Sequence, residues 1–188
     1  MSNDSTSCKS SVVDEYPKHR ITDDLYARMD AHEFVCLGHI VPHRDIIAMF
    51  ELALHHKRIV EIGAWAGIST FAFASAGATV YSVDHWGGNP GEADLLPKIG
   101  GTLTADVVYM RWCMNLKDHL FRTVFPCRGP SLLHANVWPL KVDMVFIDGD
   151  HNQCQWDIEA WLPHVRPGGV LAGHDYGIYP GVTAAVDK

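Results

Sequence analysis

The chain has 188 residues and a mass of 20.9 kDa, which suffices for one α/β domain and is short for two. Its 47% hydrophobic and 20% charged residues are typical of a soluble globular protein and exclude a chain that is wholly disordered, collagen-like or coiled-coil. With 15 Lys and Arg against 22 Asp and Glu, the net charge is −7. This charge disfavours a broad phosphate-binding surface, so no nucleic-acid partner is expected.

Two further features of the sequence predict a cytoplasmic location. No run approaches the roughly 20 apolar residues that span a bilayer, so no membrane partner is expected. The polar stretch 1–11 lacks the basic-then-apolar pattern of a secretory signal. The cysteines, five in number, are scattered and form no C-x-x-C pair. They predict reduced thiols instead of a disulfide framework or a zinc knuckle.

The N-terminal third differs in pattern from the rest of the chain. Residues 1–20 are polar without an apolar period and are predicted to form a flexible tail. Apolar spacing predicts short helices over 23–34 and 42–55, so residues 21–57 are expected to be an N-terminal helical cap. From Arg58 a regular alternation begins, which predicts one cofactor-binding domain over residues 58–188.

This alternation is between β-branched runs and helical patterns. Strands are expected over 59–63, 78–84, 123–127, 142–148 and 170–175. Helices are expected over the small-residue stretch that ends at Gly77 and over 105–120 and 153–165. Residues 167–169 are predicted to form a turn, and the Gly/Pro-rich loop 87–101 is long enough to be functional. The order predicts an α/β fold in which a doubly wound, mostly parallel sheet carries helices on both faces.

In such sheets ligands bind beyond the carboxyl ends of the strands. Gly63 and Gly67 follow the first strand and precede a helix N-terminus, a place that favours a negatively charged ligand group. Their G-x-x-x-G spacing differs from the dinucleotide fingerprint. Asp84 ends the second strand, where an acid commonly accepts hydrogen bonds from ribose hydroxyls. Turn chemistry alone is the alternative for each, but together they favour an adenosine-type ligand.

A second group of polar residues follows two later strands. Asp148 and His151 come after the fourth predicted strand, and His174 and Asp175 come at the end of the fifth. If these strands are neighbours, the four side chains converge, and their acids repel one another unless a cation binds. Oxygen and imidazole ligands suit Mg, Mn or Fe. Asp150 is expected to be only a turn residue.

Three segments carry a resemblance to a known family. Residues 61–70, 146–151 and 167–176 follow the motifs E-I-G-x-W-x-G-x-S-T, F-I-D-G-D-H and P-G-G-x-x-x-G-H-D-Y. In this order they resemble the class I S-adenosylmethionine-dependent methyltransferases, and within them a branch of small-molecule O-methyltransferases. The resemblance extends over roughly 58–187 and implies a Rossmann-like sheet.

The resemblance also implies roles for individual residues. It implies that S-adenosyl-L-methionine is bound by Glu61, Gly63, Ala64, Trp65, Gly67, Ser69, Asp84, His85, Trp86, Ser131 and Asp148. It further implies a divalent cation, expected to be magnesium, at Asp148, His174 and Asp175. His151 matches the place of a general base, and Asp148 is the second expected catalytic residue. The expected reaction is O-methylation of a small hydroxylated acceptor, whose pocket would come from the N-terminal helices and the loop 86–101.

The sequence departs from this family in two places. Relatives often have an acid that holds the adenine where this chain has Pro130, so adenine recognition would fall to Ser131 or a backbone group. The family's sheet also ends with two further strands, which would follow Lys188. Either the polypeptide is a fragment, or its sheet is shortened and leaves an edge that a partner chain, such as a second copy, could cover.

Two other functions therefore stay open. One is a degenerate cofactor-binding domain without catalysis, and the other is a hydroxylase-like enzyme with a two-histidine, one-carboxylate iron site. The expected roles of four tryptophans follow from their positions in the predicted elements. Trp156 and Trp161 are expected in the core, whereas Trp65 and Trp86 stand in loops beside the expected cofactor, where stacking and packing roles are both open.

Overall fold

The computed structural model describes residues 20–31, 33–37, 41–89 and 104–188. The tail predicted over 1–20 lies outside these ranges except for its last residue. Most of the loop predicted over 87–101 also lies outside them.

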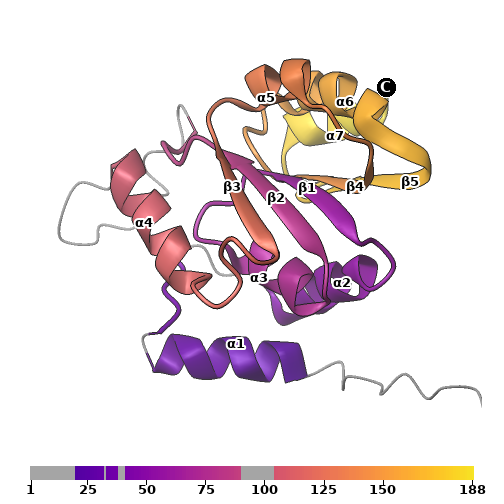
Figure 1. Ribbon diagram of the computed structural model, residues 1–188. Coiled ribbons are helices and arrows are strands. Elements are labelled where there is room, and N and C mark those ends of the chain that lie inside the picture. Colours follow the sequence, from indigo (N-terminus) through magenta and orange to yellow (C-terminus); the bar gives the residue numbers. More distant parts are fainter. Residues whose placement is uncertain (1–19, 32, 38–40, 90–103) are drawn as a thin grey trace, which may run out of the picture.

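The described chain is built on one five-stranded sheet in the order β3-β2-β1-β4-β5 (Figure 1). The strands are β1 Arg58–Ile62, β2 Thr79–Asp84, β3 Val124–Arg128, β4 Val142–Ile147 and β5 Val165–Gly173. Each of the four pairings between neighbouring strands is parallel. All carboxyl ends therefore meet at one edge of the sheet, and the strand order reverses between β1 and β4. The predicted α/β fold with a parallel sheet is confirmed.

Helices cover both faces of the sheet (Figure 1). One face carries α1 Arg20–Asp30, α2 His43–Ala53, α3 Ile68–Ser75 and α4 Ala105–Asn115, and the other carries α5 Ser131–Val137, α6 Cys154–Trp161 and α7 Pro180–Val186. Because side chains alternate along a strand, β1 contributes to a separate apolar cluster on each side. Ile59 packs with the α1–α4 cluster, and Val60 packs with the α5–α7 cluster. The doubly wound arrangement follows from this alternation.

The structure corrects two of the predicted elements. β5 begins at Val165, and residues 167–169 lie within it as an irregularity instead of a turn before it, because the pairing register shifts between Val142 and Met144 of β4. The helix predicted over 153–165 is divided into α6 and a 3-10 turn over 162–164. Helices α5 and α7 were not predicted.

The expected core position of Trp156 is wrong, because its side chain is 56% exposed. The buried stripe of α6 consists of Cys154, Asp157 and Trp161, which lie three and four residues apart. Trp156 lies off this stripe, whereas Trp161 is fully buried as predicted. No helix among the described residues is long and apolar enough to cross a membrane.

Candidate functional site

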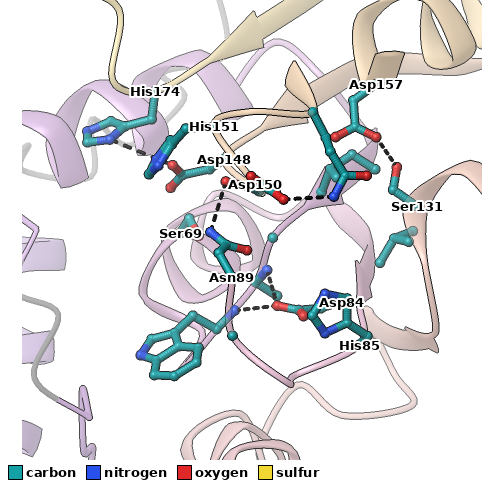
Figure 2. A pocket seen from close by; sticks show the side chains of 18 of the residues that line it. Ser69, Asp84, His85, Asn89, Ser131, Asp148, Asp150, His151, Asp157 and His174 are labelled. Atoms are coloured by element: carbon teal, nitrogen blue, oxygen red, sulfur yellow. Dashed lines mark hydrogen bonds and ion pairs between the residues drawn. The ribbon is translucent and has the colours of Figure 1, made fainter. Parts of the chain in front are cut away.

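A cavity of about 590 Å³ opens at the carboxyl edge of the sheet, over the point where the strand order reverses. It is lined by residues that follow each of the five strands, and its volume is in the range of small-molecule sites. Figure 2 shows polar side chains around this cavity in three groups. Asp148, His151 and His174 lie on one side, Asp157 and Ser131 lie on the other, and Asp84 and His85 lie below them in this view.

The turn between β1 and α3 forms the floor of this cavity. Gly63 has a φ of 85°, and a Cβ atom there would overlap the backbone carbonyl of Asp148. Gly67 has a φ of 93°, and its Cβ would lie 3.0 Å from the side chains of Trp112 and Leu116. Both positions therefore require glycine for conformation and for space, and the backbone is left exposed to a ligand.

Asp84 links the end of β2 to this turn. Its Oδ2 accepts hydrogen bonds from the backbone N–H groups of Ala64 and Trp65, each at 2.9 Å. Its Oδ1 accepts one from the N–H of Trp86 at 2.6 Å. A carboxylate has about four acceptor positions, so Asp84 keeps capacity for about one further donor from the cavity.

Two residues predicted to contact the cofactor do not line the cavity. The side chain of Glu61 is fully buried between the sheet and α3. Its carboxylate accepts hydrogen bonds there from Ser69, Thr70 and Ser82 at 2.5–2.7 Å. It points to the α3 side because strand residues alternate, and Val60 and Ile62 point the other way. Burial raises the pKa of Glu61 to about 6, although the three hydroxyl groups lower it. Glu61 is thus a structural carboxylate in the core.

Trp86 is the second residue that does not line the cavity. Its indole is completely buried, with its ring centre 4.7 Å from that of Tyr109 and 5.2 Å from that of Trp112. The indole N–H donates to the backbone oxygen of Trp65 at 3.0 Å. A packing role, which the sequence left open, is what the structure shows. The other predicted cofactor-binding residues do line the cavity: Gly63, Ala64, Trp65, Gly67, Ser69, Asp84, His85, Ser131 and Asp148.

Asp148, His174 and Asp175 are brought together at the tips of β4 and β5. Each offers one ligand atom, and these atoms all lie within 4.8 Å of one another. His174 Nδ1 is 3.0 Å from Asp175 Oδ1 and 3.8 Å from Asp148 Oδ1. Asp175 has a φ of 66°, a left-handed conformation that aspartate adopts more readily than most residues other than glycine.

The electrostatics of this cluster favour a positive charge within it. Burial, together with the charges of Asp175 and Glu61, raises the pKa of Asp148 to about 7, although the charges of His174 and His151 lower it. The hydrogen bond to Asp175 raises the pKa of His174 to about 9, and the charge of Asp148 adds to the effect. Two carboxylates thus share one imidazolium proton, and a cation could take the place of that proton.

His151 lies beside the cluster and not within it. Its Nε2 is 2.9 Å from Asp175 Oδ2, and its ring stacks on Tyr179 with 3.6 Å between ring centres. These contacts hold the imidazole in one orientation. Asp150, expected to be a turn residue, accepts hydrogen bonds from the backbone of Asn152 and the side chain of Gln153.

Two acids near the cavity were missed by sequence reasoning. Asp45 of α2 lies with its Oδ2 3.4 Å from His174 Nε2. Asp157 of α6 is 4% exposed and lines the cavity, where it accepts a hydrogen bond from Ser131. Neither belongs to a motif, and their partners are 129 and 26 residues away in the chain. Only the fold brings them to the site.

A family model described as a methyltransferase domain matches residues 60–176, which is more than half of the chain. Among curated proteins no match was found. Three solved structures share the fold at low sequence identity. PaMTH1, a methyltransferase from Podospora anserina solved with SAH bound, is 15% identical with a TM-score of 0.57. That alignment covers 85% of this chain and 62% of PaMTH1, so this chain spans less than two thirds of the length of that protein.

The other two structures are covered more fully. Rv0187 from MTB, solved with its cofactor bound, is 19% identical with a TM-score of 0.62, and the alignment covers 95% of this chain and 79% of that one. The O-methyltransferase TomG from Streptomyces achromogenes, in complex with SAM, is 16% identical with a TM-score of 0.60. Here the alignment covers 94% of this chain and 79% of TomG.

Proposed function

Because this chain belongs to the methyltransferase domain family, we propose that it transfers the methyl group of S-adenosyl-L-methionine to a hydroxyl group of a small molecule with the help of a divalent cation. One observation carries the proposal. A single cavity joins Asp84, at the strand end where nucleoside ribose is commonly held, to a cluster of two carboxylates and one imidazole. The cluster of Asp148, His174 and Asp175 and the turn from Gly63 to Gly67 both line this cavity.

The cofactor would lie across the carboxyl edge of the sheet. Asp84 would accept a hydrogen bond from a ribose hydroxyl at the acceptor position that its three backbone donors leave over. The glycine turn from Gly63 to Gly67 would let the methionine part approach the backbone closely. The cofactor itself supplies an electrophilic methyl group on a sulfonium.

The residues of the cluster fit a divalent cation. Asp148, His174 and Asp175 would hold it, and oxygen and imidazole donors suit magnesium, manganese or iron. When bound, such a cation lowers the pKa of a coordinated hydroxyl and stabilises the oxyanion. The donor set contains two carboxylates and one histidine, which supports the transferase over the two-histidine, one-carboxylate iron enzyme.

His151 would act as the general base for the acceptor hydroxyl. Donation from its Nε2–H to Asp175 leaves Nδ1 as the nitrogen with the lone pair, and the stacked Tyr179 ring holds that nitrogen in place. The proton would pass to Nδ1 as the acceptor oxygen attacks the methyl carbon, and the bond from that carbon to sulfur would break, so that the methyl ether and S-adenosylhomocysteine are the products. Positioning of the acceptor and the cofactor in line supplies much of the rate.

The test is transfer of a radiolabelled methyl group from S-adenosylmethionine to a panel of sugars, phenols and polyketide alcohols. We expect transfer in the presence of Mg²⁺, and its loss with a chelator or with Asp148→Asn. The matched control is Asp118→Asn, an exposed acid after α4, which should retain transfer. Turnover that persists under chelation would contradict the role of the cation. Cofactor binding without transfer to any acceptor would instead favour the degenerate binding domain.

A further inference from the structure

The end of the cavity on the α5 side holds few polar groups. It is lined by residues 129–132, which follow β3, and by Asp157 of α6. Pro130 has no N–H and no polar side-chain atom, so it can neither donate nor accept through its side chain. Leu132 adds apolar surface. The side chains of this wall that can form hydrogen bonds include Gln153, whose amide nitrogen donates to Asp150, and the pair Ser131 and Asp157, which Figure 2 shows facing each other.

The hydroxyl of Ser131 has a fixed orientation. The indole N–H of Trp161 can only donate, and it donates to Ser131 Oγ at 2.7 Å. Ser131 Oγ is also 2.5 Å from Asp157 Oδ1, and a carboxylate can only accept. The single hydroxyl hydrogen of Ser131 is therefore directed at Asp157 and is not available to a ligand. Since Trp161 is fully buried, this chain of hydrogen bonds is anchored in the core.

The arrangement leaves the second oxygen of Asp157 for the cavity. The one side-chain hydrogen bond that Asp157 makes among the described residues uses Oδ1, and Oδ2 lies on the side of Gly149, another cavity residue. The side chain of Asp157 is 4% exposed, so a hydrogen bond from a ligand donor to Oδ2 would form in a largely buried setting, where it is stronger than in water. Burial raises the pKa of Asp157 to about 6, which leaves it ionised and purely an acceptor at pH 8.

We propose that Asp157 selects the 6-amino group of the cofactor's adenine, with Ser131 as the residue that positions its carboxylate. This inference rests on the proposed function, in which the ribose lies on Asp84 and the reacting methyl group lies toward Asp148. The purine then points to the opposite end of the cavity, where Pro130 and Leu132 would contact its faces and Asp157 its polar edge. Asp157 belongs to α6, which follows β4, whereas Pro130 lies in the loop that follows β3. The acid that selects the adenine thus comes from a different part of the fold than the acid expected at position 130.

Isothermal titration calorimetry at pH 8 tests this with two ligands, S-adenosylhomocysteine and S-inosylhomocysteine, which carry an amino and an oxo group at position 6. We expect wild type to prefer the amino ligand roughly tenfold or more, because a charged acceptor would face the oxo group. Asp157→Asn should remove or reverse the preference. The Ser131 hydroxyl would orient the new amide oxygen, so that its NH₂ group faces the cavity. Glu159→Gln, an exposed acid on the same helix, should keep the wild-type ratio.

The ratio of the two dissociation constants does not depend on the fraction of folded protein, so a destabilised variant remains informative. Equal binding of both ligands by wild type would overturn the inference and leave the proposed function standing. The wild-type ratio retained in Asp157→Asn would do the same. Binding of neither ligand by wild type would overturn the proposed function and the inference together.

Discussion

Glu61 belongs to a motif shared with a known family, yet its side chain makes its hydrogen bonds within the core. Its carboxylate is completely buried and accepts three hydroxyl hydrogen bonds, from Ser69, Thr70 and Ser82. These bonds tie β1 to α3 and to β2, the elements that flank the glycine turn. The residue therefore supports the floor of the cavity without touching its contents.

The raised pKa of Glu61 gives a prediction for stability. Its value of about 6 lies above the ordinary 4.5, so the folded state holds a proton there more tightly than the unfolded chain. Its contribution to the free energy of unfolding is complete below pH 4.5 and is lost as the pH rises through about 6. Glu61→Gln cannot titrate. Denaturant unfolding should show wild type losing about 2 kcal/mol relative to this variant between pH 4.5 and 7.

The control for this measurement is Glu159→Gln, in which an exposed carboxyl is removed. Its unfolding curve should run parallel to that of wild type over the same pH range. Parallel curves for wild type and Glu61→Gln would contradict the account of Glu61 as a buried carboxyl with a raised pKa.

Single residues mark the limit of sequence reasoning at this site. The glycines, Asp84, Asp148 and His174 were predicted from strand ends, because any parallel sheet brings these ends to one edge. Asp157 was missed because an acid in a helix of unknown orientation is usually solvated. Only the hydrogen bond from Ser131, on another helix, reveals its direction. Side chains of β1 alternate between the two faces of the sheet, and this places Glu61 on the α3 side. Which face each residue takes is decided when β1 pairs with its neighbours, so it was not predicted from the sequence.

At the scale of elements, the strands were predictable and the connections less so. Short apolar runs predicted all five strands, and the signal is clearest for β1 and β4, which are almost entirely buried in the sheet. The extension of β5 back to Val165 depends on an irregular register with β4, which no local pattern encodes. Helix α5 has only seven residues and exposes Leu133 and Val137, so it lacks an amphipathic signal.

Helix α2 gives a prediction because it brings Asp45 to the candidate cation site. A histidine that binds a metal is commonly oriented by a carboxylate on its other nitrogen. Asp45 Oδ2 lies 3.4 Å from His174 Nε2, while His174 Nδ1 faces the cluster. Asp45→Asn should therefore weaken Mn²⁺ binding roughly tenfold, as measured by electron paramagnetic resonance of free Mn²⁺.

Glu51→Gln makes the same charge change near the other end of α2 and should leave Mn²⁺ affinity unchanged. Equal affinities in wild type and Asp45→Asn would show that α2 has no part in orienting His174. Absence of Mn²⁺ binding by wild type would instead contradict the cation site itself.

At the scale of the whole molecule, the site exists because the connections after the two central strands run to opposite faces of the sheet. The strand order reverses between β1 and β4, so the turns after these strands lead to helices on opposite faces and leave the cavity between them. Gly63 lies at this point, with its α-carbon against the backbone of Asp148.

Binding of the methyl-donating cofactor in this cavity can be tested with a pair of glycine variants. Gly63→Ala and Gly77→Ala both place a methyl group on a residue with positive φ, 85° and 83°. Both should lose about 1 kcal/mol of stability for that reason. Only at Gly63 would the methyl group meet neighbouring backbone, because nothing lies within 4 Å of the Gly77 position.

Calorimetric titration of wild type and both variants with S-adenosylhomocysteine is the most direct measurement. We predict that wild type and Gly77→Ala bind it with equal affinity and that Gly63→Ala loses at least tenfold, because displacement of Asp148 distorts the cavity. Binding by Gly63→Ala equal to that of wild type would contradict the location of the site. No binding by wild type would contradict the claim as a whole.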